Sequence, residues 1–467
     1  MRDRTMMPAT LRVPLPAALL ACAFLVAALA LGGGGSPAPL PELILELLAS
    51  ALVALSLLLP WVLIDWQRVP VAAWLIAALT ALVPLLQLIP LPPVVWHELP
   101  ARELEVRALA LIGAEDTWRT WSMAPSRTLS SLLSLAPPLL ALLMTSALGR
   151  RDRQWLVYAI AGMTLATLLL GALQLSASDF SPVHLYGVTV PMLVGFQANH
   201  NSTADLLLIG LMAVPLLVLD LTERHIIPNR AVPVLTIAAA GMALIALGVV
   251  LTASRMGIML LPIPLAASIW ILRPWLAINP RKIAFGLLAF VALAGLGVLV
   301  ARGNPVLEAV AARFDFSEEL RPQLWRDGFY VAQKYFPFGV GMGDFVPALV
   351  ADERLDAIWP SLPNRAHNDF LELACEAGAV GLLALSAISW TLAQAFWTRL
   401  RADRGRSAAM TVFAGASLAI FSLHSLVDYP FRSMALACLG AVCAGLLLSP
   451  RHSGEAASDV PSAGKTR

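Results

Sequence analysis

The sequence predicts an all-α membrane protein of about twelve transmembrane helices, with a large, partly helical loop before the tenth. Composition gives the first indication. Apolar residues make up 58% of the 467 residues and charged residues only 13%, whereas a soluble domain carries about 25% charged residues. Apolar runs of roughly 17–25 residues, enough to cross a bilayer, recur along the chain. Helices suit these runs because a segment in lipid must satisfy its own backbone hydrogen bonds.

The apolar runs divide the chain into four parts. Residues 1–301 hold the first nine spans, 302–376 form a loop domain, 377–449 hold the last three spans, and 450–467 form a tail that we expect to be disordered. The predicted spans are 15–32, 41–60, 70–91, 129–148, 154–175, 202–220, 231–251, 256–272, 283–301, 377–397, 408–424 and 431–449.

The first apolar run has two interpretations. Arg2, Arg4 and Arg12 precede it, as basic residues precede the apolar core of a cleaved signal peptide. Further spans follow at once, so we favour an uncleaved first helix. The orientation of the remaining spans is the same in either case.

Basic residues in the short connections predict the orientation, because such loops face the cytoplasm. Both termini fall on that basic side, as does the tail. The opposite, outer side holds three long connections and two short hairpins. The basic residues are Arg150, Arg151, Arg153, Arg224, Arg230, Arg273, Arg281, Lys282, Arg399, Arg401, Arg404 and Arg406, and the outer connections are 92–128, 176–201, 252–255, 302–376 and 424–430.

The longest outer connection, 302–376, is expected to fold, because an unstructured connection of that length is uncommon. Residues 317–335 predict a helix, with Ser317 as its N-cap and Pro322 in its first turn. Glycines 339, 341 and 343 follow it. We interpret them as a turn, since a nucleotide-binding loop would follow a strand and carry a GK[ST] sequence.

Polar residues from four separate pieces of sequence gather on the predicted outer side. Insertion scales assign about 2.5–3.5 kcal/mol to an arginine at membrane depth, so ionisable residues there are functional candidates. The set comprises Arg255, Arg321, Arg365, His367, His424 and Asp428.

Each candidate also has a structural explanation. Arg255 suits an interfacial anchor, and Arg321 suits either a solvated helix end or an anion site at a helix N-terminus. Arg365 is equally consistent with a surface charge. His367 is either a surface or capping residue, or a proton acceptor near neutral pH. Asn368 or Asp369 is the expected N-cap of the helix that follows.

Further polar residues flank these candidates. Glu372 and Glu376, four apart, are expected either to orient a neighbour or to line a wet helix end. His424 and Asp428 are also four apart, so Asp428 either orients an imidazole, receives an arginine or belongs to a polar turn before Pro430. The cluster of Asn199, His200 and Asn201 indicates a helix start, and Gly378 with Gly381 indicates close helix contact.

Several of these residues follow a known pattern. The stretch from His367-Asn368 to Gly378 and Gly381 reads H-N-x9-G-x-x-G, which resembles the signature of bacterial O-antigen ligases. The wider O-antigen ligase and polymerase superfamily also shows an SR pair, an R-x3-W helix and a G-x-G turn. Their counterparts here are Ser254-Arg255, Arg321 with Trp325, and Gly339-Val340-Gly341, so that the resemblance covers about residues 195–450.

The resemblance implies a C-type glycosyltransferase-like fold in the bacterial inner membrane, with its active face toward the periplasm. The implied donor is a glycan linked to undecaprenyl diphosphate, and the implied acceptor is a hydroxyl of lipid A-core or of another glycan. Transfer would be inverting, without cofactor or metal, since we find no carboxylate–histidine set with metal-ligand spacing. The implied roles are acceptor activation for His367, diphosphate binding for Arg255, Arg321 and Arg365, and support from Asn368, Glu372, His424 and Asp428.

Three alternatives remain open. A polysaccharide polymerase uses the same donor with a growing glycan as acceptor, and a protein O-oligosaccharyltransferase uses a protein. A transporter would place polar residues near the bilayer midplane, whereas the predicted spans here are nearly free of charge in their middles. The net charge of +2 gives no reason to expect a nucleic-acid partner.

Overall fold

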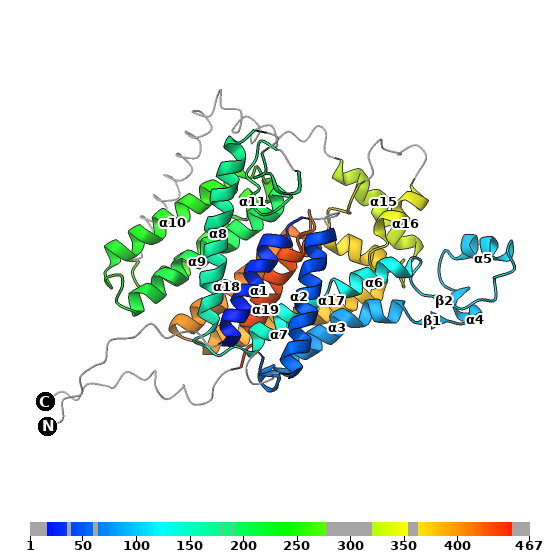
Figure 1. The fold of residues 1–467 in the computed structure, drawn as a ribbon, viewed down its shortest axis with the longest axis horizontal. Coiled ribbons are helices and arrows are strands. Elements are labelled where there is room, and N and C mark those ends of the chain that lie inside the picture. Colours follow the sequence, from blue (N-terminus) through cyan, green and yellow to red (C-terminus); the bar gives the residue numbers. More distant parts are fainter. Residues whose placement is uncertain are drawn as a thin grey trace.

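The computed structural model shows a helical bundle with one very short pair of strands (Figure 1). The predicted ninth span, 283–301, and the predicted N-cap Ser317 lie outside the residues that the structure describes. The described residues are 16–34, 39–58, 64–178, 181–187, 190–276, 320–353 and 363–450.

The membrane-type helices coincide with the predicted spans. Eight helical segments of the described residues are long and apolar enough to cross a membrane, and three shorter ones are apolar too. They are built from α1 (Pro16–Leu31), α2 (Pro39–Leu58), α3 (Val71–Gln87), α6 (Pro125–Leu133), α7 (Ala136–Ala147), α8 (Arg153–Ser176), α9 (His200–Glu223), α10 (Ala231–Leu251), α11 (Arg255–Leu260), α12 (Pro262–Leu272), α17 (Asp369–Ala402), α18 (Gly405–His424) and α19 (Met434–Leu448). The count of twelve stays a prediction.

The remaining elements lie in the connections. They are the short 3-10 helices η1 (Trp66–Arg68), η2 (Leu185–Gly187) and η3 (Pro430–Arg432), the helices α4 (Pro93–Trp96), α5 (Glu103–Ala110), α15 (Arg321–Lys334) and α16 (Phe345–Asp352), and the strands β1 (Pro90–Leu91) and β2 (Arg119–Thr120). The strands pair antiparallel, with Pro90 opposite Thr120. The helix predicted over 317–335 is confirmed across its described part.

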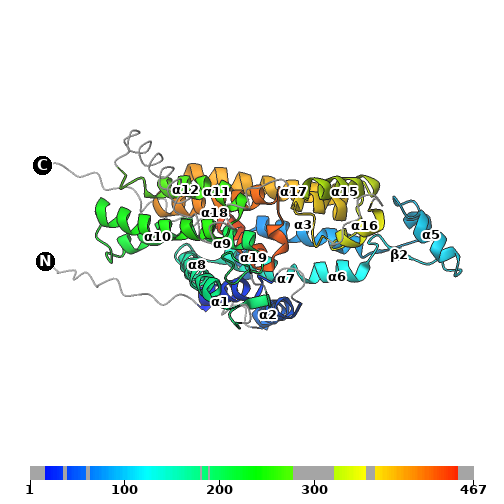
Figure 2. The same cartoon turned by 90° about the horizontal axis from the view of Figure 1, so that it is seen from above.

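The centre of the bundle is α9. Residues 206–219 of this helix are apolar on every side, as expected of a buried helix, and 78% of the most apolar window of α9 is buried. Figure 2 shows it among α8, α10 and α18, which pack against it together with α12. Asp205 and Asp220, near the two ends of α9, are each buried.

The outer connections, far apart in sequence, contact one another. Met123 N donates to Val340 O at 2.9 Å, which joins 92–128 to 302–376. Asn201 donates to Asp428, which joins 176–201 to 424–430. In Figure 1, α15 and α16 lie near the α4–α5 arm. The grouping of these loops on one side, predicted from charge, thus agrees with their contacts.

The basic connections meet in the same way at the other ends of the helices. Arg406 pairs with Asp220 at 2.6 Å, joining the end of α9 to the start of α18. Arg153 donates to Pro450 O at 3.1 Å, joining the start of α8 to the end of α19. The two groups of connections are therefore distinct in the structure as well as in composition.

Candidate functional site

The site is built around the start of α17. Asn368 is the N-cap, and its side chain accepts a hydrogen bond from Leu371 N at 3.0 Å, which confirms that prediction. His367 precedes it with φ +49°. For a non-glycine residue this backbone conformation costs about 1–3 kcal/mol, so it persists only where the surrounding structure enforces it. Here Trp325 Nε1 donates to Ala366 O at 3.0 Å, and Ala366 N donates to Glu372 at 2.9 Å.

His367 is paired with Asp428. Nδ1 of His367 lies 3.2 Å from Oδ1 of Asp428, and the imidazole packs edge-on against Tyr429, with ring centroids 4.9 Å apart. The His367 side chain is 28% exposed and that of Asp428 only 3%. Asn201 donates to Oδ2 of Asp428, and Tyr429 N donates to Oδ1. The carboxylate thus fixes one ring nitrogen of a histidine that is still open to solvent.

The charges around Asp428 keep it ionised. Burial by itself would raise the pKa of this carboxyl, but the hydrogen bond with His367 and the charges of His424, His367 and Arg321 together lower it below its usual range. The anion favours the tautomer in which Nδ1 of His367 carries the proton. Nε2 is then the basic nitrogen.

Arg321 lies within electrostatic reach of this pair. It is the first residue of α15, with Pro322 behind it, and α15 packs against α17. Gly328 at the middle of α15 allows that contact, because a Cβ there would lie 3.1 Å from Leu371. The position at a helix N-terminus, where backbone N–H groups favour anions, is as predicted.

Arg255 starts α11 beside the first turns of α9. Ser254 caps α11 by accepting a hydrogen bond from Gly257 N at 3.1 Å, and a Cβ at Gly257 would lie 2.6 Å from Ala204. The next residue along α9, Asp205, contacts His424. Arg255 therefore begins a helix that packs against the same part of α9 that contacts His424.

The carboxylates that follow His367 form ion pairs with one arginine, Arg432, which was not among the predicted site residues. Arg432 Nη2 lies 2.7 Å from Glu376, Nη1 lies 3.5 Å from Glu372, and Nε lies 3.7 Å from Asp369. Burial would lower the pKa of Arg432, but these carboxylates raise it, so the guanidinium is charged. Arg365 donates to Glu372 at 3.0 Å.

The predicted twelfth span has to be corrected at Arg432. We placed that span at 431–449, whereas Arg432 ends η3 and α19 begins at Met434. Three carboxylates at positions i, i+3 and i+7 of one helix face require a nearby cation. The spacing of these carboxylates and the presence of Arg432 two residues after Pro430 are the sequence features that could have indicated this ion-pair cluster.

Gly378 is the first glycine of the H-N-x9-G-x-x-G pattern. Its role differs from the expected close contact with another helix. It interrupts α17 with φ +54°, so Cys375 O and Glu376 O accept hydrogen bonds from Val340 N and Gly341 N, both at 2.9 Å. A Cβ on Gly378 would lie 2.1 Å from Pro337 O. The close contact is therefore with the glycine turn 337–341 and not with another helix. The turn interpretation of that segment is confirmed.

His424 is fully buried and has a partner that we did not predict. Its Nδ1 lies 2.6 Å from Oδ1 of Asp205, while Nε2 lies 4.0 Å from Oδ2 of Asp428. Asp205 lies inside a predicted span, and no local pattern marked it. The cluster of Asn199, His200 and Asn201 is a helix start as expected, because Asn199 caps α9.

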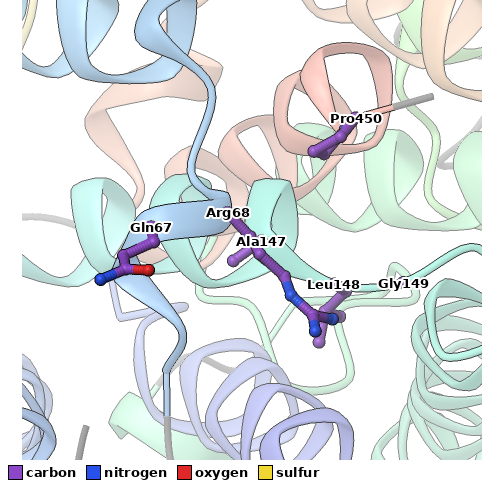
Figure 3. Close-up of a pocket in the computed structure, with 6 residues that line it drawn as sticks. All are labelled: Gln67, Arg68, Ala147, Leu148, Gly149 and Pro450. Atoms are coloured by element: carbon purple, nitrogen blue, oxygen red, sulfur yellow. The ribbon is translucent and has the colours of Figure 1, made fainter. Parts of the chain in front are cut away.

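Neither a metal cluster nor the cavity described below coincides with this site in the part of the chain that the structure describes. Among the described residues, no group of three His, Cys, Asp or Glu side chains is arranged to hold a metal ion. A cavity of about 300 Å3 lies between η1, the end of α7 and the end of α19, and Figure 3 shows the residues that line it. Arg153 donates hydrogen bonds to the backbone oxygens of Leu148 and Pro450, which line this cavity. The cavity therefore lies among the basic connections, away from His367.

The comparison with known families agrees with the motif. Residues 240–386 match the family model described as O-antigen ligase. This match supports membership of the O-antigen ligase family over that segment. The matched segment includes Arg255, Arg321, Arg365 and His367 and ends before Asp428. No curated protein matches the chain.

The family match and the apolar helices support a multi-pass membrane enzyme of ligase- or polymerase-type glycan transfer. The matched family implies glycan and lipid substrates in a membrane. The network around His367 is the candidate site for that transfer, because it joins the family domain to the turn between α18 and α19 through the contact with Asp428.

Proposed function

We propose that this protein is a ligase that transfers a glycan from undecaprenyl diphosphate to a hydroxyl of lipid A-core at the periplasmic face of the bacterial inner membrane. The pairing of His367 with Asp428 carries the proposal. It supplies an oriented base at the end of the bundle where the long outer connections meet. The loop domain 302–376 contributes α15, α16 and the glycine turn to that end.

His367 is the general base. Asp428 holds the proton on Nδ1, and Nε2 takes the proton of the acceptor hydroxyl. The acceptor oxygen forms a bond to the anomeric carbon with inversion, and the bond from that carbon to the diphosphate oxygen breaks. A positioned general base contributes about 10²–10⁴-fold to the rate.

The arginines hold the leaving group. A lipid diphosphate stays at the membrane boundary, and planar guanidinium groups bind its phosphates bidentately. We assign this role to Arg321 and Arg255, and a weaker one to Arg365, which shares its charge with Glu372. Charge-assisted hydrogen bonds of about 1.5–3 kcal/mol each can stabilise the departing diphosphate without a metal.

A deletion strain tests the choice of acceptor. Surface lipopolysaccharide is separated on a gel, with the strain complemented by the wild-type chain as control. Loss of all core-attached polysaccharide supports the ligase. Core that carries a single repeat would instead identify a polymerase, and intact lipopolysaccharide with unglycosylated envelope proteins would identify a protein-glycosylating enzyme.

A further inference from the structure

A second histidine–aspartate pair lies next to the candidate site, in the interior of the bundle. It joins His424, the last residue of α18, to Asp205 in the second turn of α9. Their side chains are each 1% exposed, and Nδ1 and Oδ1 are 2.6 Å apart. Nothing in the proposed transfer uses this pair directly.

The two pairs form one chain of alternating carboxylates and imidazoles. Nε2 of His424 lies 4.0 Å from Oδ2 of Asp428, and Oδ1 of Asp428 faces His367. The order is Asp205, His424, Asp428 and His367, from the buried interior to the half-exposed site. The state of His424 therefore acts on Asp428, and through it on His367.

The geometry determines the charge of His424. A ring nitrogen donates to a carboxylate only when it carries a proton, and Nδ1 of His424 lies at hydrogen-bond distance from Asp205. Nε2 lies 4.0 Å from Asp428, which is an ion-pair distance but not a hydrogen bond. Two buried carboxylates without a cation between them would be costly. Among the described residues, the guanidinium of Arg321 also acts on the ring electrostatically. These contacts favour the imidazolium form of His424.

We infer that His424 is a cationic positioning residue, which keeps Asp428 ionised and thereby holds the proton on Nδ1 of His367. This inference rests on the proposed function of His367. His424 is doubly protonated before and after the transfer, so no proton passes through it. Asp205 balances its charge, which allows the cation to stay inside the bundle.

The first test measures the charge without any activity. The chain, with 15N-labelled histidine, is placed in lipid nanodiscs at about pH 8, where an unperturbed histidine with a pKa of about 6.5 is neutral. We expect one doubly protonated imidazole that persists in His367→Gln and disappears in His424→Gln. A wild-type spectrum with only neutral imidazoles overturns the inference, even if no His424 variant accumulates.

The second test measures the pH profile of glycan transfer. The substitution His424→Gln removes a positive charge about 4 Å from Asp428 and so raises the proton affinity of the His367–Asp428 pair. The acid limb of the pH–rate profile of this variant should therefore move to higher pH by about 1 unit. A merely structural role would lower the rate equally at all pH values, and an unshifted limb overturns the inference. His184→Gln, at a ring that contacts Ser178 O, is the matched control.

The two tests separate this inference from the proposed function. Full transfer activity in His367→Ala would refute the role of His367, while the spectrum would still decide the charge of His424. A neutral His424 in a chain that depends on His367 would refute only the inference.

Discussion

Nδ1 of His367 lies 3.2 Å from Oδ1 of Asp428, although 61 residues separate the two in sequence. His367 belongs to the start of α17 and Asp428 to the turn between α18 and α19. In the proposed function, this contact orients the imidazole of a histidine at a helix start as a base. The account of function depends on this relationship.

Asp428→Asn should lower transfer sharply while leaving the fold in place. The amide keeps the size of the side chain but loses the anion that holds the proton on Nδ1 of His367, so we expect a loss of about 10²–10⁴-fold in kcat. The measurement is transfer by purified protein, with membrane abundance compared alongside. Asp116→Asn, at an exposed position, is the control, and equal rates in the two variants contradict the role of Asp428.

Arg432→Met should destabilise the protein. The change leaves Glu372 and Glu376 buried without their shared cation, and removing one partner of a buried ion pair costs about 3–5 kcal/mol. Unfolding of the purified protein measures the loss, and Glu376→Gln in the same chain should recover part of it.

The matched control for Arg432 is Arg68→Met. Arg68 also pairs with a carboxylate, Asp65 at 2.8 Å, but its side chain is 55% exposed. Exposed pairs contribute about 0–1 kcal/mol, so this variant should unfold like the wild type. An equally small effect for Arg432→Met would show that the three carboxylates do not depend on it.

Gly378→Ala should disrupt the junction between α17 and the glycine turn. The backbone there has a positive φ, and a Cβ would lie 2.1 Å from Pro337 O, so we expect a cost of at least 1–3 kcal/mol, roughly the strain of that conformation alone. Gly162→Ala, in α8 where a Cβ meets nothing within 4 Å, should instead stabilise by up to about 1 kcal/mol. Similar unfolding of both variants contradicts this interpretation.

Asp344 should make the contact between two outer connections sensitive to pH. Its Oδ2 accepts hydrogen bonds from Ser122 Oγ and Ala124 N, and burial raises its pKa to about 7. The unfolded carboxyl loses its proton at lower pH, so the folded state binds more protons below 7, and stability falls as the pH rises toward that value.

Limited proteolysis of residues 92–128 at a pH about one unit below and one unit above 7 measures this effect. The wild type should be cut faster at the higher pH. Asp344→Asn, which has no charge to gain, should be cut at the same rate at both. A pH effect of equal size in this variant would assign the sensitivity to another group.

Much of this arrangement follows from local sequence. The membrane helices were predictable because apolar runs are continuous, and the start of α17 was predictable because Asn368 is a good N-cap. The outer grouping of loops followed from the placement of arginines. The sequence spacing of His367 to Gly378 and Gly381 correctly indicated the segment that matches the family model.

The long-range contacts were not predictable in the same way. Asp205 and Arg432 looked like parts of predicted spans, and their partners come from distant segments; Asp369, for example, accepts a hydrogen bond from Phe431 N across 62 residues. A periodic pattern reports which face of a helix is apolar. It does not report which buried carboxylate meets which cation, or that a glycine will break a helix to receive a turn.

The most direct test of the central claim is glycan transfer by the purified chain in liposomes that contain an undecaprenyl-diphosphate-linked glycan and lipid A-core. We predict product with the wild type, with or without a chelator, and a loss of about 10²–10⁴-fold in His367→Ala at unchanged protein abundance. Wild-type activity in His367→Ala would contradict the account.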